Sequence, residues 1–101
     1  AGFHPAKGGS IPPGTAIMAY FVYMILTKHK NRIYSYVGYT KNINDRLAAH
    51  NASKGAKFTK GKQWVLIYSR QYHNKSIAMK NEYKLKKNYK LRNKIKKDYL
   101  Q

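Results

Sequence analysis

Residues 20–39 read YFVYMILTKHKNRIYSYVGY, and this stretch decides the fold. Its first part, residues 20–26, is continuously apolar and rich in aromatic and β-branched side chains, which is typical of a strand covered on both faces. Residues 27–32 have the composition of a polar turn, and residues 33–39 have that of a second strand. The stretch therefore predicts a β-hairpin.

A helix and a third strand are predicted after the hairpin. Asn42 is a good N-cap, and Asp45 three residues later suggests a box-like start to a helix over residues 43–51. A basic, glycine-containing loop follows. Residues 64–68, WVLIY, then have the β-branched and aromatic composition of a strand.

The C-terminal part of the chain is helical by pattern. Ser76 is the expected N-cap of a helix over residues 77–88. Residues 89–101 predict either another helix or a continuation of this one. The order ββαβαα indicates a small α+β domain, in which a three-stranded antiparallel sheet is flanked by helices.

Composition points to a polyanionic partner. The chain has 101 residues, enough for one small domain, with 21 Lys and Arg residues against 3 acids and a formal net charge of +18. Nucleic acid is the first candidate. An anionic membrane surface is the second, but no strongly amphipathic basic helix supports it. The absence of cysteine excludes a disulfide framework and a thiolate zinc site.

The N-terminal stretch stands apart from the domain. Residues 1–17 are rich in Gly and Pro and lack the charged and apolar regions of a signal peptide. We interpret them as a tag or linker remnant, with Met18 as the native start, or as a flexible arm. The domain then covers residues 18–101. No apolar run approaches the roughly 20 residues of a membrane span, so we expect a cytoplasmic protein, associated with the nucleoid if the source is bacterial.

The chain has a single glutamate, Glu82, which lies among lysines. On the predicted helix, Ala78, Leu85 and Met79 fall within about 60° of it, so it belongs to the apolar stripe. A carboxylate there is costly unless it is paired. Lys86 is at i+4, so an ion pair is one interpretation. A metal site held by oxygen, which suits Mg²⁺ or Mn²⁺, is the other.

The motifs of this chain resemble those of the GIY-YIG endonucleases. The first motif appears as residues 21–23, FVY, with Phe21 in place of the usual glycine, and the second appears as residues 36–38, YVG. Residues 38–51, GYTKNINDRLAAHN, match the pattern G-x-T-x-N-x-x-x-R-x-x-x-H, and Glu82 follows. Together these motifs span residues 20 to about 88. The segment also looks like the small, single-domain bacterial branch of the family, which is similar to the nuclease domain of the eukaryotic subunit that cuts branched DNA.

The resemblance implies a set of catalytic roles. Glu82 would hold a single Mg²⁺ or Mn²⁺ ion, and Arg46 would brace the scissile phosphate. Tyr23 would be the general base, while Tyr36 would order the attacking water or share that role. His50 would shuttle a proton or bind phosphate. A tyrosine is a weak base near neutral pH, but a metal and a dense cationic setting both favour its phenolate form.

The resemblance and the charge together predict a metal-dependent DNA endonuclease. No sequence-reading module is visible, so we expect recognition of branched, flapped or single-stranded DNA, substrates that also occur in DNA repair. RNA is the alternative substrate, a protein partner is a second possible source of specificity, and we expect a monomer. The alternatives are a catalytically inactive nucleic-acid-binding module on the same fold and a non-enzymatic RNA-associated factor. The lysines expected to track phosphates are Lys54, Lys57, Lys60 and Lys62.

Overall fold

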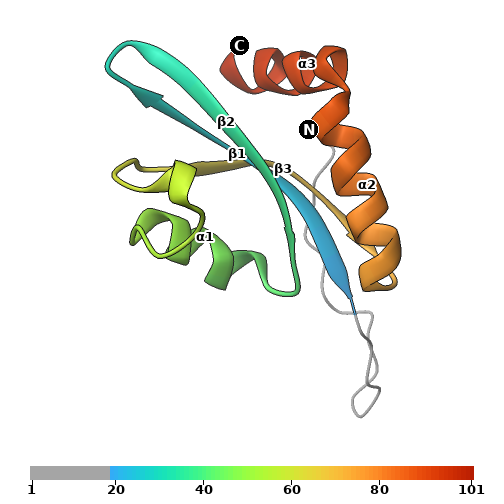
Figure 1. Cartoon of the computed structure of the whole chain (residues 1–101). Helices are drawn as coiled ribbons and strands as arrows, with labels where there is room; N and C mark the ends of the chain where they lie inside the picture. Colours follow the sequence, from blue (N-terminus) through green and yellow to red (C-terminus); the bar gives the residue numbers. More distant parts are fainter. Residues whose placement is uncertain (1–18) are drawn as a thin grey trace.

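The computed structural model describes residues 19–101, so the predicted N-terminal arm and Met18 lie outside the described residues. The chain folds into a three-stranded sheet with helices on both of its faces (Figure 1). This confirms the predicted α+β class and the ββαβαα order. In chain order the elements are β1 (Tyr20–His29), β2 (Arg32–Thr40), α1 (Ile43–Asn51), the short 3-10 helix η1 (Lys57–Thr59), β3 (Val65–Tyr72), α2 (Lys75–Lys87) and α3 (Tyr89–Leu100).

The sheet is antiparallel, with β1 in the centre and β2 and β3 at its edges. The hairpin between β1 and β2 turns through Lys30 and Asn31, whose φ angles are 51° and 64°. Positive φ at both central residues is the backbone of a tight two-residue hairpin turn, whose twist matches that of the strands. The strands therefore extend further toward the turn than the apolar pattern alone predicts.

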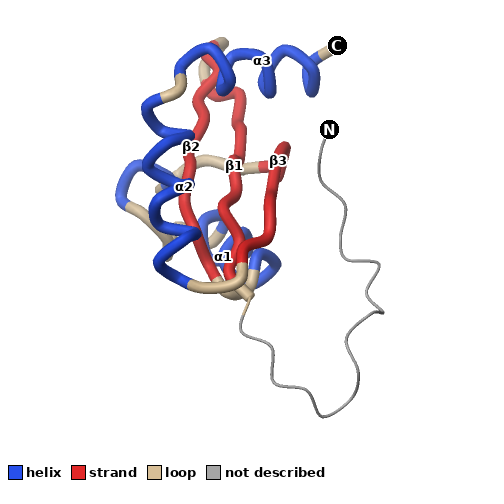
Figure 2. The backbone as a smooth tube through the Cα atoms, turned by 90° about the vertical axis from the view of Figure 1, so that its right-hand side faces the viewer, coloured by secondary structure: helices blue, strands red, loops and turns tan. Residues whose placement is uncertain are grey.

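Each face of the central strand supports a separate core. Val22, Met24 and Leu26 point to the face covered by α2, where they pack with Ala78 and Leu85. The alternate residues of β1 point to the opposite face, toward α1 and the loop that follows it. Figure 2 shows α2 lying along the sheet, with α3 crossing one end of the strands. The prediction that β1 is covered on both faces is confirmed.

Asparagine side chains fix the start of each long helix. Asn42 accepts a hydrogen bond from the backbone N–H of Asp45 at 3.0 Å, which confirms the predicted cap of α1. The box-like part of that prediction is wrong, because the Asn42 N–H donates to the hydroxyl of Thr40 at 3.2 Å. The N-cap of α2 is Asn74 rather than Ser76, since the Asn74 side chain accepts from the N–H of residue 77 at 2.9 Å.

A break at Asn88 separates α2 from α3. Its side chain accepts a hydrogen bond from the N–H of Leu91 at 3.0 Å, so a new helix begins there. This selects a separate helix from the two predicted possibilities. The apolar stripe of α2 is narrower than expected, because Ala78 and Leu85 are buried whereas Met79 is 46% exposed. None of the helices in residues 19–101 has the length and apolar character needed to span a bilayer.

Candidate active site

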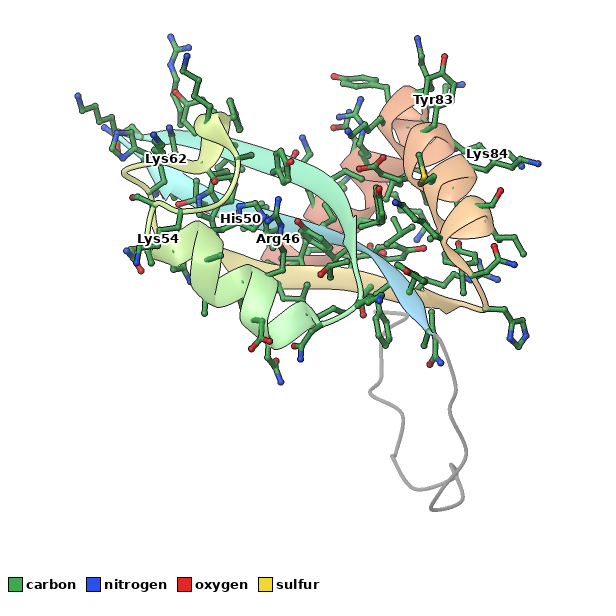
Figure 3. The ribbon with its side chains drawn as sticks, turned by 60° about the horizontal axis from the view of Figure 1, so that its bottom comes forward. Arg46, His50, Lys54, Lys62, Tyr83 and Lys84 are labelled. Carbon is green, nitrogen blue, oxygen red and sulfur yellow. The ribbon has the colours of Figure 1, made fainter. Side chains whose placement is uncertain are left out.

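Four of the five predicted catalytic side chains meet where α1 faces the sheet. Tyr23 comes from the central strand, Tyr36 from the edge strand β2, and Arg46 and His50 from successive turns of α1. The ring centroid of His50 lies 5.9 Å from that of Tyr23 and 5.1 Å from that of Tyr36. The two tyrosine rings are 6.5 Å apart. Figure 3 shows Arg46 and His50 projecting from α1 toward the strands.

A chain of hydrogen bonds runs through the imidazole of His50. The Tyr23 hydroxyl oxygen lies 2.8 Å from His50 Nε2, and His50 Nδ1 lies 2.8 Å from the Thr59 hydroxyl oxygen. Thr59 uses its only hydroxyl hydrogen to donate to the carbonyl of Ala56, at 2.8 Å. Thr59 must therefore accept from His50, so Nδ1 carries a proton. In the neutral ring Nε2 is then an acceptor, and Tyr23 donates to it.

Two members of this hydrogen-bond chain, Tyr23 and His50, are each backed by a glycine. A Cβ atom at Gly38 would lie 2.5 Å from the Tyr23 hydroxyl oxygen, which is closer than a real contact allows. A Cβ atom at Gly55 would collide in the same way with the imidazole of His50. Glycine permits the backbone to approach a side chain this closely. The glycine that closes the YVG motif therefore has a steric role in seating Tyr23.

Burial sets the ionisation of the two hydrogen-bonded rings. Desolvation raises the pKa of Tyr23 to about 12, against the opposing influence of Arg46, while Tyr36 and Glu82 raise it further. Arg46 thus favours the phenolate as expected of a cationic setting, but burial has the larger effect and keeps Tyr23 protonated in the isolated protein. Burial and the charge of Arg46 lower the pKa of His50 below 6.5. At neutral pH the pair is thus a phenol that donates to a neutral imidazole.

Arg46 is the cation of this cluster. Hydrogen bonding with Tyr23 is the largest influence raising the pKa of its guanidinium, and Tyr36 also contributes. The side chain is only partly buried, so part of the guanidinium remains open to solvent. A planar group with several N–H donors in such a position is well suited to a phosphate.

Glu82 reaches the neighbourhood from α2, and it makes the ion pair that its spacing allows. Its carboxylate lies 3.4 Å from Lys86 Nζ, with the Glu82 side chain 18% exposed and that of Lys86 49% exposed. Its charge contributes to the raised pKa of Tyr23, so it lies within electrostatic reach of that hydroxyl. Among residues 19–101, no three His, Cys, Asp or Glu side chains gather as a metal cage. A single carboxylate nevertheless fits Mg²⁺, which keeps several waters and takes phosphate oxygens as ligands.

The four predicted phosphate-tracking lysines follow α1 along the chain. Lys54, Lys57 and Lys60 are exposed. Lys62 is half-buried, because its Nζ lies 5.4 Å from the Phe58 ring centroid and donates to the Phe58 carbonyl at 3.3 Å. Lys54 and Lys62 lie beyond the end of α1 in Figure 3, on the same side of the sheet as His50. A nucleic-acid role of this loop stays a prediction.

Three residues of the site escaped the sequence pattern. Thr59 is fully buried and orients His50, yet one threonine in a basic loop carries no distinguishing signal. Gly55 stands in the same loop and reads as an ordinary turn residue. Ser69 pairs with Tyr23 across the sheet and is 3% exposed, and its hydroxyl has no hydrogen-bond partner among the described residues. The roles of Gly55 and Thr59 depend on how the loop after α1 packs against His50, and that of Ser69 depends on its pairing with Tyr23 across the sheet.

Comparison with known proteins shows the family of this chain. The family model described as "GIY-YIG catalytic domain" matches residues 19–96. The chain belongs to the GIY-YIG family. This membership gives the domain a nuclease-type function.

The GIY-YIG domain also has curated relatives. A "UPF0213 protein" of Staphylococcus haemolyticus is 43% identical over 68 residues, which cover 66% of this chain and 79% of that protein. A "UPF0213 protein" of Staphylococcus aureus (strain Mu3) is 39% identical over 69 residues, covering 67% and 80% respectively. These printed names state no substrate. No solved structure gives a significant match.

Proposed function

We propose that this GIY-YIG domain is a metal-dependent endonuclease that hydrolyses phosphodiester bonds of DNA and recognises the structure or strand state of its substrate. The observation that supports this most directly is the buried hydrogen-bond chain from Tyr23 through His50 to Thr59. This chain gives the Tyr23 hydroxyl a fixed proton acceptor, His50 Nε2. Arg46 stands beside the hydroxyl, and the net charge of +18 draws a polyanion to the surface.

In the proposed reaction Tyr23 acts as a base without first becoming a phenolate. As a water molecule attacks the phosphorus, its proton passes to the Tyr23 oxygen, and the phenolic proton passes to His50 Nε2. The imidazolium that forms keeps its Nδ1–H bond to Thr59. The raised pKa of Tyr23 makes the phenolate scarce at neutral pH, so such a coupled transfer suits this site better than a free phenolate does.

Arg46 and Glu82 would help to stabilise the negative charge of the phosphate. The guanidinium of Arg46 would stabilise the negative charge that develops as the new P–O bond forms and the bond to the leaving oxygen breaks. Glu82 would hold one Mg²⁺ or Mn²⁺ ion, which supplies Lewis-acid stabilisation of the phosphate and the leaving oxygen. Lys86, which pairs with Glu82 in this structure, would give up that pair to the metal.

Recognition by strand state follows from the kinds of groups available. Lys54, Lys57 and Lys60 are exposed charges that suit contact with phosphates, which is independent of base sequence. The nine-residue helix α1 uses its inner face for the candidate catalytic cluster. We therefore propose branched, flapped or single-stranded DNA as substrate, with RNA as the comparison substrate in any assay.

The test is a cleavage assay in which two acid-to-alanine variants are compared. Glu82→Ala and Asp98→Ala each remove an acid that forms an i,i+4 ion pair with a lysine, at 3.4 Å and 3.0 Å respectively. Labelled single-stranded, duplex, flapped and four-way DNA and a single-stranded RNA are incubated with Mg²⁺, Mn²⁺ or EDTA. We expect metal-dependent cutting by the wild type and by Asp98→Ala, and none by Glu82→Ala, with DNA binding retained by all three.

Two outcomes would contradict the proposal. Equal cutting by Glu82→Ala and Asp98→Ala would mean that Glu82 is only an ion-pair partner. Tight binding to every DNA with no metal-dependent cutting would instead support the catalytically inactive binding module.

A further inference from the structure

We propose that a basic notch between β2 and the α2–α3 junction is a second phosphate-binding subsite, which takes a phosphodiester group next to the one being cut. The notch has a volume of about 200 Å³. It is lined by Ser35, Tyr36 and Val37 of the edge strand, Lys86 of α2 and Arg92 of α3. This inference rests on the proposed nuclease function, because it concerns the strand that enters the same site.

The break between the two helices creates the notch. In one continuous helix Lys86 and Arg92, six residues apart, would point about 120° away from each other. Because Asn88 ends α2 and caps α3, the two cations instead line the same cavity. The junction thus gathers two positive charges that helix periodicity alone would separate.

Arg92 is held in place with donors to spare. Its Nε–H donates to the carbonyl of Leu85 at 3.1 Å, and its guanidinium lies 5.8 Å from the ring centroid of Tyr89. A guanidinium has five N–H donors, so this single bond within residues 19–101 leaves the terminal groups available. A partly buried, oriented guanidinium loses less side-chain freedom on binding phosphate than an exposed lysine does.

The edge strand β2 borders both the notch, on the α2 face of the sheet, and the candidate active site, on the α1 face. Tyr36 belongs to both, since it lines the notch and its ring lies 6.5 Å from that of Tyr23. β2 is an edge strand, so no other strand of residues 19–101 pairs with its outer side. Lys86 connects the two regions again through its contact with Glu82. A nucleic-acid strand bound at Tyr23 and Arg46 would therefore reach the notch by passing over the open edge of β2, from the α1 face of the sheet to the α2 face.

The chemistry of the lining selects an anion. Lys86 and Arg92 supply positive charge, and Ser35 supplies a hydroxyl that can donate. Room for several waters, at about 30 Å³ each, is also room for a phosphate group. Such a contact would position the strand without reading its bases.

The first test uses NMR and does not depend on turnover. Inorganic phosphate and then a short oligothymidylate are titrated into the full chain in EDTA, while the Nε–H signal of Arg92 and the amides of Ser35 and Val37 are followed. We expect these signals to shift together and to saturate with one affinity for each probe. Signals that stay in place while those of the loop after α1 shift would overturn the subsite.

The second test measures affinity for the same oligothymidylate by fluorescence anisotropy. Arg92→Gln is expected to weaken binding about tenfold and to reduce the slope of log K against log salt by about 0.7, the value for one phosphate of a single strand. Lys90→Gln removes an exposed charge from the same helix outside the notch, and we expect at most a twofold change. Lys86→Gln, which leaves the α2–α3 junction intact, should weaken binding severalfold if Arg92→Gln proves unstable.

The two proposals fail in different ways. If Arg92→Gln and Lys86→Gln bind no more weakly than Lys90→Gln while the wild type still cuts DNA, the subsite is wrong and the nuclease proposal stands. If the notch signals respond to phosphate but no DNA is cut with any metal, the nuclease proposal is wrong and the subsite belongs to a binding module.

Discussion

Replacing Thr59 with valine tests whether the buried hydrogen-bond chain controls the chemistry. Valine keeps nearly the same shape but has no hydroxyl to accept from His50 Nδ1. Both residues are 0% exposed, so no water replaces the lost partner. The tautomer with the proton on Nε2 is then more stable, because Nε2–H can donate a hydrogen bond to the Tyr23 oxygen. In that tautomer Nε2 no longer accepts the phenolic proton, so the proposed transfer is blocked.

The structure sets the size of both effects. Leaving the buried Nδ1–H of His50 without a partner costs about 1–3 kcal/mol of stability. The lost hydroxyl bond to the carbonyl of Ala56 adds little to this cost, because that carbonyl still accepts from the Thr59 backbone N–H at 3.0 Å. For a domain of this size, each kcal/mol lowers the melting temperature by about 4–8 °C. General acid–base catalysis contributes about 10²–10⁴-fold to rate. We therefore expect Thr59→Val to lose about 2 kcal/mol of stability and at least tenfold in cleavage rate.

The assay compares Thr59→Val with Thr27→Val. Thr27 is 4% exposed and donates its hydroxyl to the carbonyl of Gln63, so its replacement also removes a hydrogen bond of a buried threonine. It lies four residues, or about 13 Å, along β1 from Tyr23. Unfolding in urea and single-turnover cleavage are measured well below both melting temperatures. Thr27→Val should lose about 1 kcal/mol and keep its rate. A Thr59→Val protein that cleaves at the wild-type rate would refute the tautomer argument.

Three further predictions concern titration, sterics and charge. Folding lowers the pKa of His50 below 6.5, so as pH falls the unfolded chain binds a proton at His50 before the folded protein does. Stability and cleavage rate should therefore both decline below pH 6.5. The decline in stability should be smaller in His50→Gln. Gly38→Ala should force Tyr23 from its position and lower the cleavage rate at least tenfold. Circular dichroism serves as the control that the variant still folds. Changing all four loop lysines to glutamine should weaken DNA binding uniformly across sequences and flatten its salt dependence, as measured by fluorescence anisotropy. An unchanged salt slope would exclude these lysines as phosphate contacts. The four are Lys54, Lys57, Lys60 and Lys62.

The fold was largely predictable because its local signals agree with its tertiary contacts. The continuous apolar run of β1 predicts a strand covered on both faces, and the buried residues of β1 face both cores. The helix bounds of α1 follow from a good cap at Asn42. At α2 two polar residues, two positions apart, are candidates for the same N-cap, and Asn74 is the cap instead of Ser76. Propensity ranks these residues nearly equally, so only the course of the preceding strand decides between them.

The candidate site was predictable as a set of residues but not as an electrostatic environment. The motif spacing identifies Tyr23, Arg46 and His50, which the fold brings together at one end of a hydrogen-bond chain. A count of charges predicts an environment that favours phenolate. Burial has the larger effect, however, and it raises the pKa of Tyr23 instead. Burial is a property of the packed molecule, which composition does not report.

The same positive charge that would attract the proposed DNA substrate opposes the binding of a metal ion. The formal charge is +18, and the carboxylate of Glu82 is already paired with Lys86 at 3.4 Å. One carboxylate in such a field is a weak site for a divalent cation, since no cluster of three His, Cys, Asp or Glu side chains occurs within residues 19–101. A bound phosphate changes this balance, because it brings negative charge and oxygen ligands to the site and competes for Lys86. We therefore expect metal affinity to rise when nucleic acid is bound, so that DNA and metal each strengthen the binding of the other.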